Sequence, residues 1–130
     1  MRTNDYQLLG SFFTLADAEA PEPNRLRLQV QLNAHHALFA GHFPGQPVVP
    51  GVCVLGLVKD VLQQHLAKEL LLRTCSNSKF LRPIDPITMP ALTLTVGYTQ
   101  RDFLLDFAAS IQHEHQLLCR VAGSFQSDFL

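Results

Sequence analysis

Charge is scarce in this sequence and almost balanced. Only 16% of the 130 residues are charged, and the formal net charge is −1 at pH 7. A protein that binds nucleic acid or an anionic membrane surface by electrostatic attraction needs a clear excess of positive charge. The composition therefore gives no reason to expect nucleic acid or a membrane as a partner.

Long apolar runs and metal-ligand spacings are also missing. No apolar run approaches the roughly 20 residues that a membrane-spanning helix needs, and residues 1–5 lack the apolar stretch of a secretory signal. The cysteines are odd in number and share no ligand spacing: Cys53, Cys75 and Cys119. The adjacent His35 and His36 have no third ligand at a suitable distance along the chain. We expect reduced thiols in a cytoplasmic protein with no metal and no cofactor.

Hydrophobic residues, by contrast, are abundant. They make up 47% of the chain, which is ample for one core at this length. We find no internal repeat and no linker, and the short segment 19–24 reads as a hairpin loop. The sequence therefore predicts one domain over residues 1–130.

Two periodicities predict an α+β fold. Apolar residues alternate with polar ones in several short segments, which is typical of strands with one buried face. The expected strands are 6–17, 25–32, 73–81, 91–99, 103–111 and 117–125, and Pro83 and Pro86 should end the third or confine it to an edge. The last three are joined by short connections and should form an antiparallel meander. One segment, 51–70, is apolar on nearly every side and predicts a central helix. A sheet that curls around this helix buries both apolar faces.

The most informative segment precedes this helix. It reads Gly41-His42-Phe43-Pro44-Gly45-Gln46-Pro47-Val48-Val49-Pro50-Gly51-Val52. One histidine lies between two glycines, three prolines stiffen the loop, and the apolar helix follows directly. A second segment reads Lys79-Phe80-Leu81-Arg82-Pro83-Ile84-Asp85-Pro86. The two segments, in this order, resemble the hot-dog-fold 3-hydroxyacyl-acyl-carrier-protein dehydratases of fatty-acid synthesis. The resemblance covers most of the chain and implies one helix wrapped by a curved antiparallel sheet.

The resemblance also implies roles for individual residues. His42 would be the base that removes the C2 proton of a 3-hydroxyacyl thioester, because neutral imidazole suits that task near pH 7. The Gly51 amide, at the helix N-terminus, would polarise the thioester carbonyl. The acyl site would be lined by Phe39, Phe43, Pro50, Val52 and Gly56, although packing is the simpler explanation for the two phenylalanines.

The family's helix carboxylate is missing from its usual position, which falls on Gly56. Asp60 lies one turn further on and about 40° around the helix, so that it faces broadly the same way. It is the candidate that could hold the leaving hydroxyl or a water. Charged residues on helices are usually solvated, and that simpler explanation carries the greater weight for Asp60.

Three functions remain open from the sequence. The first is a 3-hydroxyacyl-thioester dehydratase that acts on an acyl-carrier-protein or coenzyme A thioester. The resemblance implies that it works as a homodimer with two composite sites, or as a higher oligomer of such dimers. The second, motivated by Gly56, is a non-catalytic acyl-binding subunit that forms a heterodimer with a homologue. The third is a hot-dog acyl thioesterase, which usually also needs a carboxylate.

Overall fold

The computed structural model describes residues 12–36, 39 and 47–127. Within them lie one long helix and six strands. Their bounds are β1 (Phe13–Glu22), β2 (Arg25–Leu32), α2 (Gly51–Leu66), β3 (Leu71–Phe80), β4 (Ala91–Arg101), β5 (Leu104–His113) and β6 (Gln116–Gln126). The expectation of one central helix and about six strands is confirmed.

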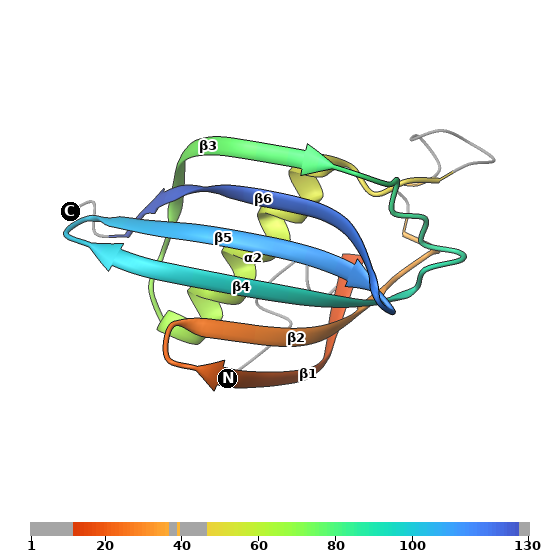
Figure 1. Ribbon diagram of the computed structural model, residues 1–130, viewed down its shortest axis with the longest axis horizontal. Coiled ribbons are helices and arrows are strands. Elements are labelled where there is room, and N and C mark those ends of the chain that lie inside the picture. The colour runs from red at the N-terminus through yellow and green to blue at the C-terminus, as the bar shows by residue number, and fades with distance from the viewer. Residues whose placement is uncertain (1–11, 37–38, 40–46, 128–130) are drawn as a thin grey trace.

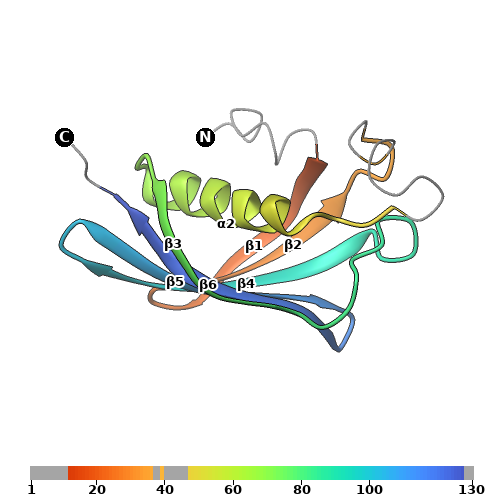
Figure 2. The same ribbon diagram turned by 90° about the horizontal axis from the view of Figure 1, so that it is seen from above.

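The strands form one antiparallel sheet in the order β1-β2-β4-β5-β6-β3 (Figure 1). The predicted meander of the last three strands is confirmed, because β4, β5 and β6 are neighbours in that order. β1 and β3 are the two edges, and the edge position of β3 matches the two prolines that follow it. Between them the sheet curves, and α2 lies along its concave side (Figure 2). This is the hot-dog arrangement.

The period of the sequence decides which side chains fill the concave side. Along β2 buried and exposed residues alternate without a break, from Arg25 outside to Leu32 inside. The core face of α2 meets this surface with Val54, Leu57 and Leu62, none of which retains accessible surface. At roughly 1.5–3 kcal/mol for each large apolar side chain, this burial is the main force that holds helix and sheet together.

The helix ends four residues earlier than the apolar pattern predicts. Ala67 adopts a left-handed conformation with φ of 55°, and its N–H donates to the Gln63 carbonyl. The Lys68 N–H donates to the same carbonyl at 3.3 Å. This closure of the last turn ends α2 at Leu66, and the buried Leu70 belongs to the connection to β3.

The first hairpin also differs from the prediction. Residues 6–11 of the predicted strand 6–17 lie outside the described residues, and β1 runs on to Glu22 through most of the predicted loop. Only Pro23 and Asn24 form the turn, because Asn24 accepts a left-handed backbone with φ of 64°. Pro21 is tolerated in this strand because β1 is an edge.

Two further details of the meander were predicted wrongly. Phe103 is the first residue of the predicted strand 103–111, but it lies in the β4–β5 turn and is 60% exposed. In β6 both Leu118 and Cys119 are buried, which breaks the expected alternation. A register shift in the β5–β6 pairing beside Ile111 accounts for this, because a bulge rotates the following side chains.

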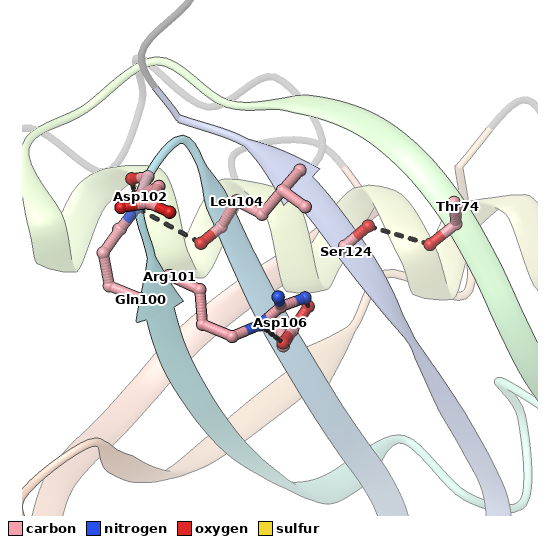
Figure 3. A network of polar contacts seen from close by, with 7 residues as sticks. All are labelled: Thr74, Gln100, Arg101, Asp102, Leu104, Asp106 and Ser124. Carbon is pink, nitrogen blue, oxygen red and sulfur yellow. Dashed lines mark hydrogen bonds and ion pairs between the residues drawn. The ribbon is translucent and has the colours of Figure 1, made fainter.

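The edge strand β3 is attached to β6 through an irregular ladder. Its pairing with β6 shifts register twice, between Leu72 and Thr74 and between Cys75 and Asn77. Between these shifts the backbone of β3 comes very close to Gly123 of β6. A Cβ at Gly123 would stand 2.0 Å from the Thr74 carbonyl oxygen. Beside this contact the hydroxyls of Thr74 and Ser124 share a hydrogen bond of 2.8 Å (Figure 3). Glycine at position 123 is therefore required by the bulge of β3.

Candidate active site

The candidate site centres on the N-terminus of α2. Pro50 is the N-cap, with an extended backbone and no side-chain cap, and the first helical turn holds no acidic residue. The first N–H groups of a helix have no partner within the helix and carry its positive dipole end. The Gly51 amide therefore belongs to a helix terminus of the kind that stabilises negative charge.

The two motifs of the sequence meet at this helix terminus. The Val49 N–H donates to the Ile84 carbonyl at 2.9 Å, and Ile84 itself is buried. The segment after Ile84 is held in turn by Asp85, whose carboxylate accepts the backbone N–H of Ile87 at 2.8 Å and that of Thr88 at 3.4 Å. Asp85 is thus explained as a turn residue, and the segment that it shapes fixes the entry to α2.

Phe80 covers the first residue of the helix. A Cβ built on Gly51 would lie 3.1 Å from Phe80 Cζ and 3.3 Å from Cε1, which is tighter than an ordinary contact. The resemblance gave the Gly51 amide a role in polarising a carbonyl, but its contact with Phe80 was not predicted. The ring is 43% exposed, so it forms one wall of the surface beside the Gly51 amide. No local pattern signals this contact, because 29 positions separate the two residues in the chain.

The other residues expected to line the acyl site differ in their surroundings. Val52 is 74% exposed and points away from the core, and Pro50 is partly buried. Phe39 is buried, and its ring meets that of Phe12 edge-on at a centroid distance of 5.0 Å, so packing accounts for it. His42 and Phe43 lie outside the described residues.

Gly56 and Asp60 lie on a partly buried flank of α2. Burial raises the pKa of the Asp60 carboxyl above its ordinary value, and nearby Lys59 partly offsets this rise. Among the described residues none forms a hydrogen bond or ion pair with the Asp60 carboxylate. A carboxyl group with a raised pKa and no fixed partner is able to act as a proton donor.

The buried thiols do not have the properties of nucleophiles. Burial raises the pKa of Cys53, and that of Cys119 rises to about 11, also mainly through burial. Such groups stay protonated at neutral pH and are unreactive. Across residues 12–36, 39 and 47–127, no three His, Cys, Asp or Glu side chains gather as a metal site. The described part of the chain also contains no helix with the length and apolar character needed to cross a membrane.

The curved sheet, the central helix and its exposed N-terminus define a protein of the hot-dog class. Residues 18–121 match the model of the ApeI-like family, described as ApeI dehydratase. The chain belongs to this family.

Individual relatives agree with this assignment. The chain is similar to the 3-hydroxyacyl-acyl-carrier-protein dehydratases FabZ of Wolbachia sp. subsp. Drosophila simulans (strain wRi) and Rickettsia canadensis (strain McKiel), at 38% and 41% identity. These matches cover 37% of this chain, and 38% and 39% of the relatives. The chain thus spans about two fifths of the length of the curated relatives it matches.

Among solved structures, the dehydratase heterocomplex ApeI:P from Xenorhabdus doucetiae is similar with a TM-score of 0.67 and 25% identity. The match covers 88% of this chain and 96% of that one. A hypothetical thioesterase from Streptococcus pneumoniae, solved with coenzyme A, has a TM-score of 0.65 at 9% identity and covers 98% and 97% of the two chains. The second likeness concerns the fold alone.

Proposed function

We propose that this protein dehydrates 3-hydroxyacyl thioesters held on an acyl carrier protein or coenzyme A. His42 takes the C2 proton, and the negative charge that develops on the thioester oxygen is stabilised by the Gly51 N–H and the helix dipole. The C3 hydroxyl leaves as water once a donor protonates it. The observation that carries the proposal is the uncapped helix N-terminus at Gly51, which the two dehydratase-like motifs build together.

The proton donor is the unusual part of this site. Gly56 carries no acid where the related dehydratases carry a carboxylate, and Asp60 is the nearest replacement on the same flank of α2. The raised pKa of Asp60 supports this role, because burial favours the protonated form of its carboxyl group. We propose that Asp60 protonates the leaving hydroxyl, directly or through a water.

The direct test is an assay of the purified protein alone on 3-hydroxyacyl-acyl-carrier-protein substrates. His42→Ala is expected to lower the rate about 10²–10⁴-fold, the usual contribution of general-base catalysis. His35→Ala is the matched control, because His35 is exposed and precedes the motif; its rate should stay that of the native protein. Equal rates for His42→Ala and the native protein would remove His42 from the mechanism.

We further propose that two chains pair through β3. Every residue of β3 is exposed in the single chain, and large apolar side chains stand at both ends of this edge: Leu71, Leu72, Phe80 and Leu81. An open edge of this kind presents unpaired backbone groups and apolar surface, which a second edge strand covers. Phe80 lies on the exposed β3 edge and also contacts Gly51. Pairing through β3 therefore brings the partner subunit beside the N-terminus of α2.

Cys75 provides the test of edge pairing. It is exposed near the middle of β3, whereas Cys53 and Cys119 are buried. Antiparallel pairing centred on the strand brings the two Cys75 residues within the roughly 4.4–6.8 Å Cα separation that a disulfide bridges. Mild oxidation should therefore give a covalent dimer that Cys75→Ser abolishes. A dimer in light scattering that never cross-links through Cys75 would place the interface elsewhere.

A heterodimeric subunit is the second candidate function. Gly56 favours it, and so does the likeness to the ApeI:P complex, which is titled a heterocomplex. In this case the chain alone is inactive and monomeric, and adding the homologue encoded nearest to it gives activity. His42→Ala in the mixed complex then tells whether this chain contributes a base or only a surface. Release of free thiol in place of the unsaturated product would instead identify a thioesterase.

A basic pair on the outer face of the sheet supports an acidic carrier as the partner. Lys79 of β3 and Arg120 of β6 stand directly opposite each other, both exposed. Like charges at such positions repel, so an anionic partner stabilises the pair. Lys79→Glu is expected to raise KM for the carrier-bound substrate and leave KM for a coenzyme A or N-acetylcysteamine thioester unchanged. Equal changes in both would exclude a docking role.

A further inference from the structure

Gln64, near the end of α2, is the most poorly satisfied polar side chain in the described structure. Both polar atoms of its carboxamide are buried, and among the described residues neither has a hydrogen-bond partner. Its neighbour Gln63 is fully explained, because its side-chain oxygen accepts the Leu70 N–H at 2.9 Å. An unsatisfied buried polar group costs about 1–3 kcal/mol. Gln64 therefore needs an explanation that the fold does not supply.

A cavity of about 100 Å³ adjoins this carboxamide. It lies between the C-terminal half of α2 and the first hairpin. Among the described residues, five apolar side chains line it beside Gln64 and His65: Leu15 and Ala18 from β1, Leu26 and Leu28 from β2, and Val61 from α2. His65 stands at its edge, with its ring against that of Tyr98 at a centroid distance of 6.1 Å. A mostly apolar lining with one hydrogen-bonding group is typical of small-molecule sites, but this cavity is smaller than the roughly 300–1,000 Å³ of most such sites, so only a small ligand fits.

The chemistry of the carboxamide specifies the ligand. It presents a donor and an acceptor side by side, and a primary amide or a protonated carboxylic acid offers the reciprocal pair. An ionised carboxylate does not suit the cavity, because burying a charge there without a partner costs far more than burying a neutral group. The amide atoms are shielded in the present conformation, so ligand binding requires a rotation about the terminal bonds of Gln64.

We propose that this cavity binds a small uncharged amide or acid with a short aliphatic chain, held by two hydrogen bonds to Gln64. By the rise of an α-helix, Gln64 lies roughly 20 Å from Gly51, at the other end of α2. The cavity is therefore separate from the candidate active site. A ligand here contacts both the helix and the β1–β2 hairpin, and it relieves the unsatisfied carboxamide.

The test is a methyl-detected NMR titration of the full chain with hexanamide. We expect saturable shifts at Leu15, Leu28 and Val61. Gln64→Met keeps the length of the side chain and removes both hydrogen bonds, so the affinity should fall roughly tenfold or more. Gln31→Leu is the matched control, because Gln31 is exposed on the outer face of β2. It should bind hexanamide as the native protein does.

Two further measurements keep the result decisive. N,N-dimethylhexanamide has the same chain but no donor, so it should bind about tenfold more weakly than hexanamide. Ala18→Leu retains Gln64 and fills the cavity from β1, so it should abolish the shifts even if Gln64→Met fails to fold. The proposal is overturned if hexanamide gives no saturable shift up to its solubility limit, or if it binds Gln64→Met with native affinity. None of these readouts depends on dehydratase activity.

Discussion

Replacing Gly123 by alanine is expected to detach the edge strand β3 from the sheet. The added Cβ would stand 2.0 Å from the Thr74 carbonyl oxygen and 2.9 Å from Cys75 Cα. Both are backbone atoms, so no side-chain rotation relieves the clash, and β3 must move away by more than 1 Å before an ordinary carbon–oxygen contact is restored. That movement also breaks the hydroxyl hydrogen bond between Thr74 and Ser124 (Figure 3).

The expected loss of stability is the sum of the backbone clash and the broken Thr74–Ser124 hydrogen bond. Overpacking a rigid site costs about 1–3 kcal/mol, and a hydrogen bond of this kind contributes about 1 kcal/mol. We therefore expect Gly123→Ala to lower the free energy of unfolding by about 3 kcal/mol. For a chain of this length that corresponds to a fall in Tm of roughly 10 °C. The proposed β3 dimer should weaken as well, because its edge has moved.

The assay is urea unfolding, followed by light scattering to measure the dimer. Gly97→Ala is the matched control, because its Cβ would meet nothing closer than 4.0 Å. It removes a glycine from a strand without a clash, and should leave stability unchanged or higher by about 0.5–1 kcal/mol. Ser124→Ala isolates the hydrogen bond, at about 1 kcal/mol. If Gly123→Ala unfolds at the same urea concentration as Gly97→Ala, the reasoning about the bulge is wrong.

Three other predictions concern α2 and the thiols. Gly56→Glu should raise dehydratase activity by restoring an acid at the position where the related dehydratases carry one, and Asp60→Asn should abolish the native rate. A native rate that Asp60→Asn leaves unchanged would remove Asp60 from the mechanism, and a folded Gly56→Glu variant that is as inactive as the native protein would refute autonomous catalysis. Burial raises the pKa of Asp60, so the native state binds the carboxyl proton more tightly than the unfolded state does. The stability that this proton contributes is present at low pH and is lost as the pH rises through the raised pKa. In urea titrations Asp60→Asn should therefore be more stable than the native protein at pH 7 and lose that advantage once the pH falls below the ordinary carboxyl pKa. An aromatic disulfide reagent at pH 8 should label Cys75 rapidly and reach Cys53 and Cys119 only after unfolding, because their pKa values are raised by burial; rapid labelling of two thiols in the folded protein would contradict the burial of one of them.

The local pattern of apolar and polar residues was enough to predict the helix, the strands and the class of fold. The unbroken alternation of β2 and the all-round apolar character of α2 depend on neighbours in the chain, so period and composition predicted them well. Boundaries were less predictable. Ala67 and Asn24 take left-handed conformations that end α2 and turn the first hairpin, although neither is the glycine that most clearly marks such positions.

The two sequence motifs were enough to predict a candidate site at the start of α2, although they do not reveal which residues are in contact there. Only the tertiary structure joined Val49 to Ile84 and set Phe80 over Gly51, because these partners are distant in sequence and leave no periodic trace. The same holds for Gly123, because only the pairing of β6 with β3 shows that the β3 backbone leaves no room there for a Cβ. The burial of the Gln64 carboxamide beside a cavity likewise depends on how the first hairpin packs against α2. Sequence determines what each segment tends to form, since those tendencies are local. Close contacts between strands, buried polar groups without partners, and cavities arise only when distant segments pack together. They are therefore decided by the tertiary structure.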